Sequence, residues 1–266
     1  MIGPTGTANL LAELTADLPG WSFAFVLVLA RVSAAIMLLP GIGEAAPPPM
    51  VRIGLALGIT LLLLPAIAPS VPPVPEAGIL ASSMLAAEVV TGLWFGWLAR
   101  LFALALPISA QFIAYLLGLS SVLQPDAEMS PQSTALAKLF ELAAPLLILV
   151  SGLYALPLSA MAGLYQLIPP GSWLPAADGS AMALQIVGRT FALALRLASP
   201  FVLVAVVWNV AIGLMARLMP RMQIYFVAMP AQIIGGLLLL AGLSGAIAAA
   251  WQDSVRAAFD SLPGTG

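Results

Sequence analysis

GLSSVLQPDAEMSPQ, residues 118–132, is a short polar stretch interrupted by prolines that lies between two long apolar blocks. The block before it, residues 79–117, carries charge only at Glu88 and Arg100, and the block after it spans residues 135–168. Irregular backbone at membrane depth is tolerated only where it is buried in protein or lines a cavity. The pattern therefore predicts an all-α protein of long, kinked apolar helices organised around this segment.

The composition of the chain indicates a membrane protein. Of 266 residues, 62% are hydrophobic and 8% are charged, whereas about a quarter of the residues in a soluble domain are charged. The net charge is -2 and the basic residues are scattered, which argues against a nucleic-acid partner. The chain has no Cys and no His, so disulfides, thiol and imidazole chemistry are excluded and carboxylates are the remaining metal ligands. We expect no cofactor and no enzymatic activity.

Six apolar segments are candidate membrane-spanning helices, because about 20 residues at 1.5 Å rise cross roughly 30 Å of hydrocarbon. Residues 1–20 contain no basic residue, so we expect no cleavable signal peptide there and predict a short interfacial helix. Prolines and glycines separate the segments, and Pro107 leaves open whether the third block holds one span or two. The expected segments are residues 21–39, 51–64, 79–119, 133–168, 182–215 and 224–251.

A small-residue face is predicted on the third segment. Gly92, Gly96 and Arg100 recur every four residues and therefore share one side of a helix, where membrane helices pack closely. Glu88 precedes them by one more turn. As an isolated carboxylate, Glu88 is better explained by a pair across a helix interface than by proton transport.

Arginines inside the apolar segments are also predicted to face protein. Arg31 lies near the middle of the first segment, where burial in lipid costs about 2.5–3.5 kcal/mol on insertion scales. Arg189 and Arg196 are seven residues apart on one helix face; Arg189 can snorkel to an interface, whereas Arg196 lies deeper. Arg31 and Arg196 are thus expected, with Glu88 and the small-residue face, at subunit-packing positions.

Basic residues also predict the orientation in the membrane. With six spans, three connections that hold most of the basic residues fall on the same side of the membrane. They contain Arg52, residues 100–138 and residues 217–221. The positive-inside rule assigns that side to the cytoplasm. The acidic pair Asp126 and Glu128 in the central segment could bind a cation or relay a proton, although a solvated loop explains it better. No nucleotide-binding or hydrolase motif is present.

Several passages resemble the FliR family of flagellar type III export-gate proteins, which has a close relative in injectisomes. They are LARVSAAIMLLPGIG at residues 29–43, MVRIGLALGITLLLLPAI at 50–67, the passage from GLSSVLQPDAEMSPQ to LYQLIPPG within 116–171, and ALRLASPFVLV to MPAQIIGG within 194–236. Their order and spacing are more specific than any one of them. The chain departs from the family at Gly152-Leu153-Tyr154, where members often have glycine-histidine, and at Pro220-Arg221, where they often have proline-glutamine.

The resemblance implies an assembly. One copy would join several FliP and FliQ subunits in a cone-like export gate of the bacterial inner membrane, at the flagellar basal body, nucleate its assembly, and pass unfolded substrates out of the cytoplasm. Residues 1–181 would be FliP-like, and residues 182–266 would form a FliQ-like helical hairpin and tail. The turn of this hairpin would contact neighbouring subunits or a membrane protein of the export motor (FlhB- or FlhA-like). Its residues are Arg217, Pro220 and Arg221.

The family's plug loop corresponds by position to residues 111–126. The resemblance implies an apolar seal and a polar path, joined at a glycine. The expected seal residues are Phe112, Tyr115, Leu116 and Leu119; the glycine is Gly118; and the expected path residues are Ser120, Ser121, Gln124 and Asp126.

Three other functions remain open. An injectisome gate component would share these features. A solute transporter acting alone would require inverted repeats and polar groups at the membrane midplane, and the two halves show no convincing repeat. A passive membrane scaffold is the third possibility.

Overall fold

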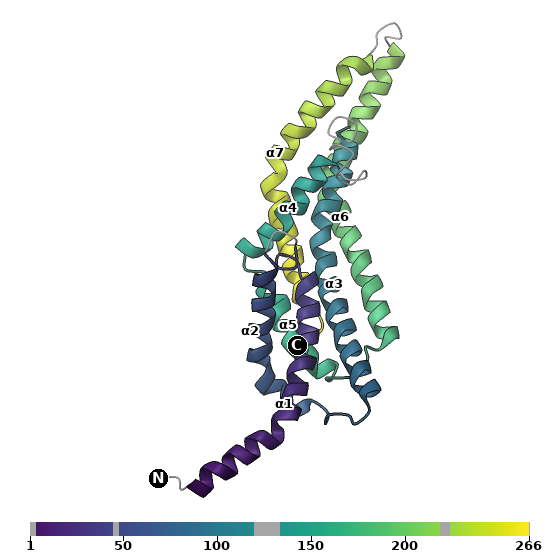
Figure 1. The fold of residues 1–266 in the computed structure, drawn as a ribbon. Helices are drawn as coiled ribbons and strands as arrows, with labels where there is room; N and C mark the ends of the chain where they lie inside the picture. The colour runs from purple at the N-terminus through teal and green to yellow at the C-terminus, as the bar shows by residue number, and fades with distance from the viewer. Residues whose placement is uncertain (1–3, 45–47, 120–133, 219–223, 266) are drawn as a thin grey trace. The chain divides into compact units, whose positions relative to one another are not determined.

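All regular structure in the described part of the chain is helical, as the sequence predicts. The computed structural model describes residues 4–44, 48–119, 134–218 and 224–265. Seven α-helices and one short 3-10 helix lie in these ranges (Figure 1). They are α1 (Pro4–Leu38), α2 (Pro49–Ile67), η1 (Ala68–Ser70), α3 (Gly78–Leu116), α4 (Ala135–Val150), α5 (Ala155–Leu167), α6 (Ala176–Leu218) and α7 (Ile224–Phe259).

Two compact units divide these helices. The first unit contains Met1–Arg100, Tyr154–Ala181 and Asp260–Gly266, and the second contains Leu101–Leu153 and Met182–Phe259. The helix α3 therefore contributes its first part to one unit and its last part to the other. The C-terminal tail after α7 belongs to the first unit.

The helices have the length and hydropathy of a membrane protein. Among the described residues, five helices are long and apolar enough to cross a membrane, or six if α4 and α5 form one broken span. The five are Leu18–Leu38 of α1, Pro49–Ser70, α3, α6 and Ala228–Phe259 of α7.

Proline positions explain where the expected helix boundaries were wrong. A separate helix over residues 1–20 was expected, but α1 continues through Pro19, and α3 likewise continues through Pro107. An internal proline removes one backbone hydrogen bond, and long membrane helices tolerate this loss when neighbouring groups compensate. The third apolar block is consequently one helix.

The long, kinked helix expected over residues 133–168 is interrupted, and its two parts, α4 and α5, are bent by 74° where they meet. The break lies at Gly152, whose φ of +74° is in the left-handed region that glycine adopts at little cost. Pro145 lies inside α4, and Pro157 lies in the first turn of α5, where the missing N–H has no intrahelical partner to lose. Glycine, rather than either proline, therefore ends the helix.

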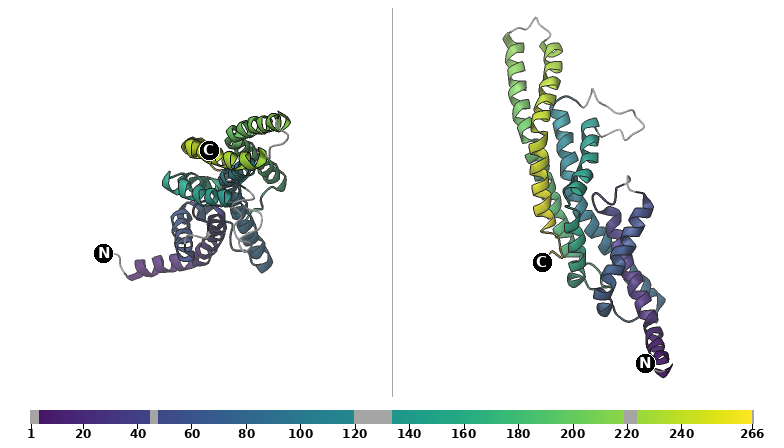
Figure 2. Two further views of the ribbon diagram at one scale, coloured as in Figure 1. Left: turned by 90° about the horizontal axis from the view of Figure 1, so that it is seen from above. Right: turned by 90° about the vertical axis from the view of Figure 1, so that its left-hand side faces the viewer.

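The core of each unit consists of large apolar side chains from several helices. In the first unit, α1 and α2 lie side by side (Figure 1), and Leu27 and Phe95 are fully buried. In the second unit, α6 and α7 run side by side as the expected hairpin (Figure 2). The rings of Phe102 and Phe259 meet edge to face there, with centroids 6.5 Å apart.

Candidate functional site: the stems of the central segment

The C-terminal end of α3 leads into the central segment through a tight, fully hydrogen-bonded turn. Gly118 has a φ of +72° and donates its N–H to the carbonyl of Tyr115 at 3.2 Å. The N–H of Leu119 reaches back to the carbonyl of Ala114 at 2.9 Å. These two bonds form a Schellman motif, which commonly ends helices at a glycine. Gly118 thus defines where the helix stops.

The predicted seal residues differ in exposure around this turn. Leu119 is buried, Phe112 and Leu116 are half-buried, and the side chain of Tyr115 is 59% exposed. Of these four residues, Tyr115 is the most exposed. The predicted path residues Ser120, Ser121, Gln124 and Asp126 lie outside the described residues, as does Glu128.

The chain leaves the central segment at Thr134, the N-cap of α4. Its hydroxyl oxygen accepts the N–H of Ala137 at 3.2 Å, a bond that satisfies one of the free N–H groups of the first helical turn. The same hydroxyl donates to the side-chain oxygen of Gln111 at 3.0 Å, and the backbone N–H of Thr134 also donates to that oxygen at 3.2 Å. Gln111 therefore holds the two stems of the segment, in α3 and α4, against each other.

A second glutamine contacts the α3 stem from α7. The side-chain amide of Gln232 donates to the carbonyl of Leu116 at 2.8 Å, and Leu117 lies directly against Gly236. Thr134, Gln232 and Gly236 were not predicted from the sequence as site residues. Gln232 and Gly236 are one helical turn apart, and this spacing predicts that they share a helix face. Their partners in α3 lie over a hundred residues away, so the spacing does not predict what that face contacts.

A buried ion pair organises the first unit. The guanidinium of Arg31 contacts the carboxylate of Glu88 through two bonds, Nε to Oε2 at 2.6 Å and Nη2 to Oε1 at 3.0 Å, and both side chains are fully buried. Arg31 also donates to the carbonyl of Ile168 at 2.9 Å and lies over the Tyr165 ring. The N–H of Gly171 donates to Glu88 at 2.6 Å. The pair thus joins α1, α3 and the α5–α6 connection.

The predicted small-residue face of α3 packs against α1 of the same chain. A Cβ atom at Gly92 would collide with the backbone carbonyl of Arg31, and one at Gly96 would collide with the carbonyl of Ala35. Arg100, one turn further on, pairs with Glu44 at 3.3 Å. Contact between these residues and a neighbouring subunit stays a prediction.

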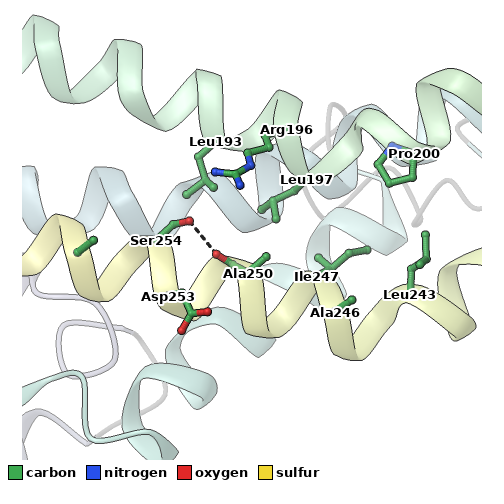
Figure 3. Close-up of a pocket in the computed structure, with 11 residues that line it drawn as sticks. Leu193, Arg196, Leu197, Pro200, Leu243, Ala246, Ile247, Ala250, Asp253 and Ser254 are labelled. Carbon is green, nitrogen blue, oxygen red and sulfur yellow. Dashed lines mark hydrogen bonds between the residues drawn. The ribbon is translucent and has the colours of Figure 1, made fainter.

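The remaining predicted packing and turn residues lie on the α6–α7 hairpin. Figure 3 shows Arg196 extending into a groove of about 490 Å³ between the two helices, whereas Asp253 points away from α6. In the described part of the chain, no carboxylate lies within ion-pair distance of Arg196. Arg217 lies in the last turn of α6, and Pro220 and Arg221 lie outside the described residues.

Known proteins resemble the chain over most of its length. The family described as "Bacterial export proteins, family 1" matches residues 22–258. The chain belongs to this family, whose flagellar members are named FliR. The FliR of Caulobacter vibrioides is 35% identical, with 90% of this chain and 95% of the relative aligned. FliR of Escherichia coli is 28% identical, with 86% of this chain and 87% of the relative aligned. FliR of Bacillus subtilis is 25% identical, with 82% of this chain and 84% of the relative aligned.

Family membership confirms the resemblance inferred from the sequence. All three relatives carry the name "flagellar biosynthetic protein FliR", so the chain is a component of flagellar protein export. Its membrane-length helices make it a membrane protein of that apparatus.

Proposed function

We propose that this FliR-family chain is a non-enzymatic subunit of the flagellar export gate. It joins FliP-like and FliQ-like subunits in the bacterial inner membrane, nucleates their assembly, and helps to form the channel through which unfolded flagellar proteins leave the cytoplasm. The family match over residues 22–258 supports this function. The exposed apolar faces of α6 and α7 give the chain large surfaces for neighbouring subunits or lipid.

The observation that carries the proposal is the geometry of the two stems. A plug loop can rearrange without losing its place only if its two ends stay attached to the rest of the protein. Side-chain hydrogen bonds at the two stems supply such an attachment. Gln111 links the stems to each other, and Gly118 ends α3 at a defined residue. We therefore assign residues 111–126 as the plug, with Phe112, Tyr115, Leu116 and Leu119 as its apolar part.

The division into a FliP-like and a FliQ-like part is also proposed. One of the four places where the chain passes between the compact units falls after Ala181, which supports a hairpin that starts at residue 182. Residues 101–153, which include the plug stems, group with this hairpin. In the proposed gate the hairpin turn, with Arg217, Pro220 and Arg221, faces the cytoplasm and contacts neighbouring subunits or the export-motor membrane protein.

Composition of the native complex tests the proposed function. Tagged protein is purified from its own cells in a mild detergent, and the co-purifying proteins are identified and counted by mass spectrometry. We expect one copy with several FliP-like and FliQ-like subunits, and flagellar rather than injectisome partners. A stable monomer or homodimer would overturn the proposal and favour a transporter or scaffold acting alone.

Removal of part of the segment tests the plug role separately. Deletion of residues 118–124 should leave the complex assembled but make the cells permeable to ions or small solutes. The deletion strain is compared with the wild type by solute uptake and by recovery of the intact complex. An assembled gate that stays tight after the deletion would contradict the assignment of the plug.

A further inference from the structure

We propose that Gln232 and Gly236 of α7 form a clamp on the C-terminal end of α3, so that α7 positions the stem of the central segment. These two residues are positioning residues: they act on the segment through α3. The clamp consists of two contacts, the hydrogen bond from Gln232 to Leu116 and the packing of Gly236 against Leu117. Its importance for the plug rests on the proposed function.

The hydrogen bonds at the end of α3 show why a partner from outside the helix is needed. The last four carbonyl groups of an α-helix lack partners from the regular helix. In α3 these are the carbonyls of residues 114–117, because the last regular bond joins the N–H of Leu117 to Ile113. The first two accept N–H groups of the terminal turn: Ala114 from Leu119 at 2.9 Å, and Tyr115 from Gly118 at 3.2 Å. The third carbonyl, that of Leu116, accepts the side-chain amide of Gln232 at 2.8 Å. A residue of α7 thus satisfies a carbonyl that the terminal turn itself leaves free.

Packing at the next turn of α7 reinforces this contact. Gly236 lies four residues after Gln232 and therefore on the same helix face. A Cβ atom at Gly236 would collide with the Cδ2 atom of the buried Leu117 side chain, whereas a Cβ atom at Gly235 would meet nothing within 4 Å. Of these two adjacent glycines only Gly236 faces Leu117, so a Cβ atom there would force the Leu117 side chain to move. Steric fit and hydrogen bonding therefore coincide at one place on α7.

The clamp connects the hairpin to the segment. Because α7 is one arm of the hairpin that we assign to subunit contacts, a neighbour that displaces α7 also withdraws the amide of Gln232 from α3. The other stem has an independent attachment through Gln111 and Thr134. Displacement of α7 therefore loosens the α3 stem while the link to α4 persists.

Two substitutions test the clamp in the purified complex. Gln232→Leu removes the amide donor while keeping a side chain of similar size, and Gly236→Ala displaces Leu117. The matched controls are Gln185→Leu, at an exposed position of α6, and Gly235→Ala. Amide hydrogen exchange of the peptide covering residues 112–119 reports directly on the end of α3.

We expect exchange in this peptide to become about five-fold faster in Gln232→Leu, the change that corresponds to one lost hydrogen bond of about 1 kcal/mol. Gly236→Ala should have a similar effect, and adding Leu117→Ala, which removes the obstructing atoms, should restore slow exchange. Neither control should alter it. Unchanged exchange in both clamp variants, or no rescue by Leu117→Ala, would overturn the clamp.

Solute permeability separates this inference from the plug assignment. If the clamp variants exchange faster and the cells also leak, the clamp positions the plug as proposed. If exchange is faster but neither these variants nor the deletion of residues 118–124 leak, the clamp is supported and the plug assignment fails. If the cells with the deletion leak but hydrogen exchange is unchanged in the clamp variants, the clamp is overturned. The plug assignment then remains intact.

Discussion

Removal of the negative charge of Glu88 should strongly destabilise the first unit. Glu88→Gln preserves the shape of the side chain and one oxygen that can accept the N–H of Gly171, so the substitution leaves no cavity. It also leaves the guanidinium of Arg31 fully buried without a counter-charge. Loss of one partner of a buried ion pair costs about 3–5 kcal/mol, because the other charge remains desolvated.

A double-mutant cycle isolates the energy of this pair. Arg31→Met alone leaves a buried carboxylate, whereas the combination of Arg31→Met with Glu88→Gln removes both charges. We expect the double variant to be less destabilised than the sum of the single variants by about 2 kcal/mol, within the range measured for contacting residues. The carbonyl of Ile168, which loses its donor when Arg31 is replaced, limits the recovery.

Thermal unfolding in mild detergent, followed by circular dichroism, measures these effects. At about 2–4 °C per kcal/mol for a chain of this size, Glu88→Gln should lower the melting temperature by roughly 10 °C. The exposed pair Lys138–Glu141 on α4, 3.0 Å apart, is the matched control, and Glu141→Gln should cost at most about 0.5 kcal/mol. Similar small shifts for Glu88→Gln and Glu141→Gln would refute the reasoning.

Three further changes test local features by the same melting assay. Gly92→Ala places a Cβ against a backbone carbonyl of α1 and should lower the stability by about 1–3 kcal/mol through overpacking. The control Gly58→Ala, with open space around it, should be neutral or stabilising. Equal effects of the two substitutions would contradict the close packing at Gly92. Thr134→Ala should cost about 1 kcal/mol through the lost cap and speed hydrogen exchange in the first turn of α4; unchanged exchange would argue against the cap and its bond to Gln111. Gly152→Ala should cost about 1–2 kcal/mol because its φ is positive, and an unchanged melting temperature would show that the break does not depend on glycine.

Hydropathy and residue spacing predicted the parts of this protein that depend on local pattern. The all-α class and most of the apolar helices follow from long uncharged segments, which can satisfy their backbone only as helices. The cost of burying charge predicted that Arg31 and Glu88 face protein, and the four-residue spacing of Gly92 and Gly96 predicted a close-packed face. Lys138 and Glu141 are three residues apart in the sequence, a spacing that allows a pair on one helix face, and they form that pair on α4.

Helix boundaries were less predictable because prolines act according to their surroundings. Pro19 and Pro107 lie within continuous helices, while Gly152 ends one. A proline inside a helix removes one hydrogen bond and adds steric strain. Packing in the folded chain decides whether the helix continues in spite of this loss. The local sequence contains no information about that packing.

By itself, the sequence determined that this is a membrane protein of long helices with charges that require protein partners and a polar segment at its centre. Only the tertiary structure decided which groups meet: Arg31 with Glu88 and the carbonyl of Ile168, and Gln232 with the carbonyl of Leu116. The physical reason is range. Periodicity and burial cost act on one helix at a time, whereas these bonds join groups separated by 57 to 137 residues and exist only after the helices have packed.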